Sequence, residues 1–152
     1  MEEIVSKPQI EINIHRGANQ IGGCITEIAT AQSRIIIDLG SNLPGSKVKE
    51  LMAEQIAEVV SGVDAIFYTH YHGDHVGLFQ FVPDSIPQYI GEGALEVMKC
   101  KYETLSRHEN IEQELFAINR MKTYQANCTI QIGDIRITPY YCSHSAFYSY
   151  MF

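Results

Sequence analysis

The sequence contains no stretch of apolar residues long enough to cross a lipid bilayer, although 45% of its 152 residues are hydrophobic. Residues 1–7 also lack the basic region and the following apolar segment that mark a secretory signal. No proline-rich or low-complexity tract interrupts the chain, which has five prolines. We therefore expect a soluble cytoplasmic protein with no membrane partner, built as one domain or most of one.

Cysteine is scarce, and its spacing is not that of a disulfide framework. The four cysteines form no C-x-x-C pair and come without a secretory signal, which predicts free thiols in a reducing cytosol. Cys142 stands two residues before His144 and could in principle be a thiolate ligand. We expect it instead to be a buried core residue, the common environment of a free cysteine.

Positive charge is also in short supply. Lysine and arginine number 11 against 18 acidic residues, which gives a formal net charge of −7. A surface that attracts nucleic acid nonspecifically is normally basic, so this composition argues against such a surface. It does not exclude a nuclease, because bound divalent ions would supply positive charge at the site itself.

Residues 69–77, THYHGDHVG, hold the densest chemical information in the chain. They follow an apolar run, residues 63–68, that predicts a short buried strand, so they begin at a strand end. Imidazole nitrogens and carboxylate oxygens are the ligands that zinc and similar ions take in open catalytic sites. This spacing favours a metal site, with two groups aimed at one ion and two at a neighbour, over solvated loop histidines. The candidate ligands are His70, His72, Asp74 and His75.

The pattern His70-x-His72-x-Asp74-His75 resembles the metal-binding signature of the metallo-β-lactamase fold hydrolases. Residues 35–40, IIIDLG, resemble an earlier strand of that superfamily, which ends in an aspartate, here Asp38. Residues 142–145, CSHS, resemble its third motif. The glycine-rich residues 15–24 and the His144-Ser145 pair are similar to the ribonuclease J branch.

The resemblance implies a role for each of these residues. His70, His72 and His144 would hold one ion, while Asp74, the expected catalytic residue, and His75 would contribute to a second. Zinc is the expected metal, as one or two ions, with manganese or iron as alternatives. Asp38 would orient metal ligands or simply cap its own turn. Ser145 would contact a substrate phosphate or satisfy backbone groups near the site.

The same resemblance extends beyond this sequence, because the family's bridging aspartate and a further histidine would follow residue 152. Residues 147–152, FYSYMF, are apolar and predict a strand. We therefore expect residues 1–152 to be the N-terminal portion of the domain, truncated after the third metal motif. We also expect weak occupancy of the second metal site and little activity. Unpaired strand edges predict a homodimer or higher self-association.

Hydrophobic periodicity predicts a mixed α/β chain, and the resemblance implies an αββα sandwich, here incomplete. Alternating residues 9–14 and 24–29 predict a hairpin, and the continuously apolar residues 33–38 predict a central strand covered on both faces. A helix is expected from Ser46 to a cap at Gly62. Further expectations are a strand at 87–90, one broken or two separate helices over 95–118, and a hairpin around Gly133-Asp134.

Four functions remain open. The resemblance favours an RNA-directed phosphodiesterase similar to ribonuclease J, which would make RNA its partner. A hydrolase of small esters, thioesters or lactams could use the same metal loop. A fragment that binds metal without turnover is the third, and a redox di-iron site a fourth.

Overall fold

The computed structural model describes residues 10–152. Residues 1–9 lie outside this part. They include residues 1–7, for which no secretory signal was expected, and Gln9 of the predicted first strand. Six strands form one sheet in the order β1-β2-β3-β4-β5-β6. The sheet is antiparallel from β1 to β3 and parallel from β3 to β6. Its strands are β1 (Glu11–Arg16), β2 (Ile25–Ala29), β3 (Arg34–Ile37), β4 (Ala65–Tyr68), β5 (Gln88–Gly91) and β6 (Lys122–Tyr124).

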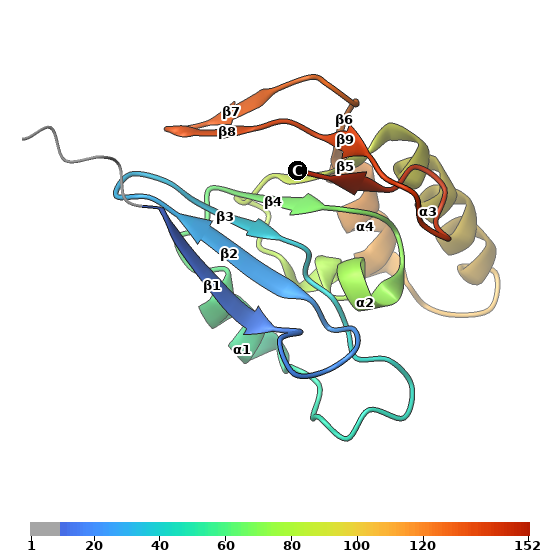
Figure 1. Ribbon diagram of the computed structural model, residues 1–152. Coiled ribbons are helices and arrows are strands. Elements are labelled where there is room, and N and C mark those ends of the chain that lie inside the picture. Colours follow the sequence, from blue (N-terminus) through green and yellow to red (C-terminus); the bar gives the residue numbers. More distant parts are fainter. Residues whose placement is uncertain (1–9) are drawn as a thin grey trace, which may run out of the picture.

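Helices cover one face of this sheet (Figure 1). Side chains of β3 and β4 that point to this face, such as Ile36 and Ile66, pack with Ile56 and Met98 from the helices. The two longest helices, α3 and α4, confirm the prediction of two helical segments after the fifth strand. The helices are α1 (Ala53–Val59), α2 (Gly73–Val76), α3 (Glu92–Leu105) and α4 (Glu112–Arg120), with a short 3₁₀ helix, η1 (Phe79–Phe81).

A hairpin lies over part of the other face (Figure 1). It consists of β7 (Ile130–Ile132) and β8 (Ile135–Ile137), joined at Gly133 with a positive φ of 53°, as the glycine-aspartate pair predicted. Its isoleucines pack near Ile35 and Phe67 of the sheet. Because β3 and β4 are covered on both sides, their apolar residues run without interruption.

Strand β1 carries apolar residues that the hairpin does not cover. Ile12 is paired with Ile28 of β2, which in turn is opposite Ile35, so these three share the face on which the hairpin lies. Ile10, Ile12 and Ile14 are nevertheless each more than half exposed. The predicted first hairpin is confirmed, and its outer strand is an exposed edge of the described sheet.

Two sequence expectations differ from the structure. The helix predicted from Ser46 begins only at Ala53, because Glu50 accepts hydrogen bonds from the Asn42 backbone and from Arg16 and ties the preceding segment to neighbouring loops. Of the strand predicted at 147–152, only Tyr150–Met151 (β10) is extended, paired with Tyr140–Tyr141 (β9). The mixed α/β class is confirmed. None of the helices within residues 10–152 has the length and apolar character that a bilayer crossing needs.

Candidate metal centre

Residues 69–77, here called the metal loop, leave the sheet at the end of β4. All four residues of β4 are buried, and the chain turns out of the sheet at Thr69 and His70. His72 has extended backbone angles and directly precedes α2, which contains Asp74 and His75. Because β4 lies between parallel neighbours, its carboxyl end is where such a sheet normally carries its functional loops. The sequence therefore places four potential ligands at one edge of the sheet.

Three imidazoles converge beside this edge: His70, His72 and His144. One ring nitrogen from each lies within 4.8 Å of the others. The Nε2 atoms of His70 and His144 are 3.2 Å apart, close to the separation of about 3.3 Å between two nitrogens on a tetrahedral zinc ion. The donor set therefore fits one divalent ion, with a small closing movement of His72. The structure brings together the three histidines that the sequence assigned to one ion.

Asp74 and His75 form a second group next to the first. Asp74 Oδ2 lies 3.7 Å from His75 Nε2, and the His75 ring centroid is 4.2 Å from that of His70. His75 uses its other nitrogen, Nδ1, to contact Asp38 at 2.7 Å, so Nε2 is the atom that remains for a ligand. Their role in holding a second ion stays a prediction.

Asp38 is buried at the end of β3 and reaches across to the metal loop. Its carboxylate accepts hydrogen bonds from the Thr69 amide at 2.7 Å and from His75 Nδ1 at 2.7 Å. Its backbone φ of 61° is in the left-handed region, and its amide donates to the Phe67 carbonyl at 2.9 Å. These contacts are those that an orienting residue needs, and they go beyond capping a turn. The orienting role remains a prediction.

Thr69 is a site residue that the sequence did not reveal. Its hydroxyl lies 2.9 Å from Asp38 Oδ2 and 2.9 Å from His70 Nδ1. When the hydroxyl donates to the carboxylate, it can accept from His70 Nδ1, which leaves the His70 Nε2 lone pair facing His72 and His144. The only sequence signal is its position between a buried strand and a candidate ligand.

The lowered pKa values of His70 and His72 favour metal binding, because both imidazoles are then neutral. Burial, together with the positive charges that His75, His144 and His72 can carry, lowers the pKa of His70 to about 3. Burial and His144 also lower the pKa of His72. Burial alone would lower the pKa of His75 too, but the hydrogen bond and charge of Asp38 outweigh it and raise that pKa. His70 is therefore neutral at pH 7 and needs to lose no proton to become a ligand.

Close backbone packing holds the metal loop in place. A Cβ atom at Gly40 would lie 1.8 Å from the Asp74 carbonyl oxygen, so only glycine fits there. The same carbonyl accepts a hydrogen bond from the Cys24 amide at 3.0 Å, and the Leu39 amide donates to the His75 carbonyl at 2.8 Å. Gly22, with a φ of 77°, also packs against the Asp74 side chain. The glycine-rich residues 15–24 thus border the site.

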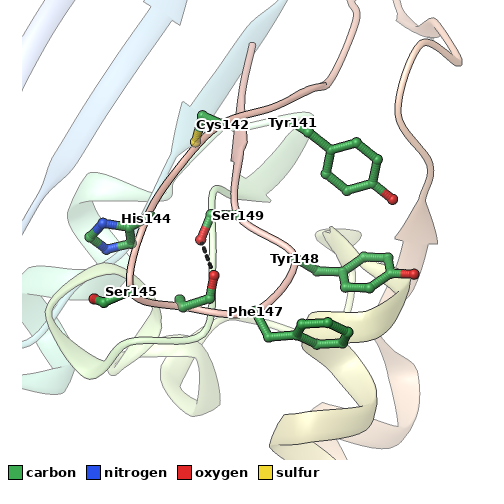
Figure 2. Close-up of a pocket in the computed structure, with 8 residues that line it drawn as sticks. Tyr141, Cys142, His144, Ser145, Phe147, Tyr148 and Ser149 are labelled. Atoms are coloured by element: carbon green, nitrogen blue, oxygen red, sulfur yellow. Dashed lines mark hydrogen bonds between the residues drawn. The ribbon is translucent and has the colours of Figure 1, made fainter.

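The remaining candidates lie around this centre or away from it. Ser145 is exposed and lines a hollow of about 520 Å³ together with His144 (Figure 2). Cys142 is exposed as well, so the prediction of a buried core cysteine is wrong. The reason is that β9 ends at Tyr141, and the chain then follows the rim of the site. His15 lies apart from the cluster and contacts Glu27 at 2.9 Å.

Comparisons with solved structures give the fold. A protein of unknown function from Enterococcus faecalis V583 matches 95% of this chain and 40% of its own, with a TM-score of 0.70 and 18% identity. MEM-A1, a subclass B3 metallo-beta-lactamase isolated from a soil metagenome library, matches 85% of this chain and 50% of its own, with a TM-score of 0.56 and 18% identity. BJP-1, a subclass B3 metallo-beta-lactamase of Bradyrhizobium japonicum, matches 85% of this chain and 49% of its own, with a TM-score of 0.55 and 16% identity.

The chain thus spans half or less of the length of these three structures. No curated protein matches the sequence significantly. The sequence profile of the Metallo-beta-lactamase superfamily matches residues 25–121, well over half of the chain, and these include the whole metal loop. The chain belongs to the metallo-β-lactamase superfamily.

Proposed function

We propose that this chain carries the metal centre of a metal-dependent hydrolase. His70, His72 and His144 would hold one divalent ion, and Asp74 and His75 would contribute to a second. The observation that carries the proposal is the convergence of three ring nitrogens within 4.8 Å, supplied by two segments that are distant in sequence. Zinc is the ion that this all-imidazole set fits best, with manganese or iron as alternatives.

A bound divalent ion would lower the pKa of a water molecule and stabilise negative charge that develops on the substrate. The protein's own groups have distinct tasks around it. Asp38 and Thr69 fix the ring orientations of His75 and His70 through hydrogen bonds of 2.7 and 2.9 Å. Asp74, the one carboxylate of the metal loop, would help to position the attacking water and accept its proton at Oδ2.

RNA is the substrate that we propose for the intact enzyme, with phosphodiester hydrolysis as the reaction. Two features support it. The glycine-rich residues 15–24, which resemble those of ribonuclease J, pack through Gly22 against the Asp74 side chain. Ser145 is exposed beside His144, where its hydroxyl could contact a phosphate oxygen. The negative net charge leaves the attraction of phosphates mainly to the bound ions.

Hydrolysis of a small ester, thioester or lactam is the second candidate. The likeness to subclass B3 metallo-beta-lactamases favours it only at the level of the fold, because identities are 16–18%. Assays of zinc-loaded protein with a generic phosphodiester and a generic β-lactam would separate the two. Bound zinc without turnover of either would support the third reading, a metal-binding fragment.

Metal analysis is the direct test of the site. We expect about one tightly bound zinc per chain, and His72→Ala should lose it, because only two imidazoles would remain. His108→Ala is the matched control, since His108 is an exposed histidine away from the cluster. Zinc that binds equally to all three proteins, or to none of them in excess zinc, would contradict the proposed site.

We also propose that the chain self-associates. The support is the apolar surface of Ile12 and Ile14 on the edge strand β1 and of Ile10 directly before it. Sedimentation at increasing concentration would test this, and a single monomeric species throughout would contradict it.

A further inference from the structure

The hollow beside His144 has an aromatic wall that the metal chemistry does not use. It is an open hollow lined by the segment that runs from β9 to β10 and has a volume of about 520 Å³. Figure 2 shows the side chains of Tyr141, Phe147 and Tyr148 on one side of this segment and those of His144 and Ser145 on the other, and all five residues line the hollow. One small cavity thus combines three aromatic rings with a candidate metal ligand.

This cavity adjoins the metal centre directly. A second hollow of about 270 Å³ is lined by Asp38, Thr69, His70 and His75. The two hollows share three lining residues, Cys142, His144 and Ser149. A molecule held against the aromatic wall would therefore extend past His144 toward the metal centre.

The three rings differ in how open they are: Tyr141 stacks on Tyr150 at 4.7 Å and 27°, whereas Phe147 has no stacked partner among the described residues. Phe147 and Tyr148 meet at 65° with centroids 4.5 Å apart, and Tyr141 and Tyr148 meet at 79° and 5.6 Å. Phe147 is 62% exposed, so its ring is the one that offers an open face for stacking. Tyr148 is held from behind, because a Cβ at Gly93 of α3 would come within 2.5 Å of its ring. The wall is thus a fixed stacking surface.

The chemistry of the cavity selects a flat, uncharged group. None of its eight lining residues, all within the described part of the chain, is lysine, arginine, aspartate or glutamate. An anionic group would find no cationic side chain on the aromatic side. A planar heterocycle can stack there, while hydroxyl groups such as that of Ser145 offer hydrogen bonds at the rim.

We propose that this aromatic cavity binds a nucleobase of the substrate, next to the phosphate that reaches the metal centre. The proposal rests on the proposed function, because it supplies the base-binding part of a phosphodiesterase site. Stacking is tolerant of sequence, since every base has a π face. The cavity would therefore position one nucleotide without selecting its identity.

The test uses the chain in EDTA, so that binding is measured apart from any metal or hydrolysis. Adenosine 5′-monophosphate and ribose 5-phosphate would be titrated by NMR. We expect the nucleotide to bind at least several-fold more tightly than the sugar phosphate, and Phe147→Ala to weaken nucleotide binding by about 10-fold. Phe116→Ala is the matched control, because Phe116 is a comparably exposed phenylalanine, at 56%, on the distant α4.

Two results would overturn the proposal: equal binding of the nucleotide and the sugar phosphate, or equal effects of Phe147→Ala and Phe116→Ala. Both variants remove exposed side chains, and unchanged thermal unfolding would confirm that they fold. Failure of the unmodified chain to bind zinc would refute the metal centre, while Phe147-dependent nucleotide binding in EDTA would still support the cavity. The two proposals can therefore fail separately.

Discussion

Gly40 lies against the metal loop, and its replacement by alanine measures how closely the two must pack. The added Cβ would lie 1.8 Å from the Asp74 carbonyl oxygen and 2.9 Å from the Cys24 amide nitrogen. Both are backbone atoms that cannot rotate away, so the loop must retreat by more than about 1 Å. That movement weakens the Cys24 to Asp74 hydrogen bond of 3.0 Å and the Leu39 to His75 hydrogen bond of 2.8 Å.

The expected loss for Gly40→Ala is about 2–4 kcal/mol of unfolding free energy, from two weakened hydrogen bonds and overpacking. Zinc affinity should fall by about 10- to 100-fold, because His70 and His72 belong to the same loop and are displaced with it. Urea unfolding in EDTA and competition with a zinc chelator measure the two effects. Gly73→Ala is the control within the same loop, since its Cβ would find only Ser41 Oγ at 3.6 Å. A Gly40→Ala protein as stable as Gly73→Ala would refute the packing argument.

Two further predictions concern buried carboxylates. Asp38→Asn should lower zinc affinity by about 10- to 100-fold in a chelator competition, because the amide replaces the carboxylate that holds the Thr69 hydroxyl against His70 Nδ1; unchanged affinity would contradict the orienting role. The hydrogen bond from Arg34 lowers the pKa of Glu27 from 4.5 to about 2. The resulting stabilisation, at most about 3 kcal/mol, is fully present above pH 4.5 and is lost as the pH falls toward 2. Urea unfolding from pH 7 to pH 3 should show the gap between wild type and Glu27→Gln shrinking with acidity, and a constant gap would contradict this assignment.

The candidate ligands of the metal loop could be identified from the sequence because they are local. Four ligand-type side chains within residues 69–77, directly after an apolar strand, define a site before the fold is known. The orienting role of Asp38 came from the family resemblance, because its position at the end of a buried strand indicates only a turn cap. His144 depended on family resemblance, since nothing in its own surroundings indicates that the chain returns to His70.

Tertiary contacts explain what the sequence could not show. The role of Thr69 depends on a carboxylate 31 residues away. The first turns of the predicted helix after Ser46 fail to form, since Glu50 instead contacts Arg16 at 2.7 Å. Cys142 reads as a core residue in sequence but lies on the rim of the site. In each case a long-range partner outweighs local preference.

The third imidazole gives the metal centre a link to folding. His70 and His144 are 74 residues apart in the chain, whereas the His70-His72 pair is available even in a short peptide. In the unfolded chain, closing a loop of that length costs about 4 kcal/mol of chain entropy. In the folded protein, the sheet and the β9–β10 segment already hold His144 beside His70 and His72. The chain entropy is therefore lost on folding and not on metal binding, and His144 has a high effective concentration at the other two rings. Tight binding should therefore be a property of the folded chain alone, and the ion should act as a reversible crosslink between the metal loop in the middle of the chain and the β9–β10 segment.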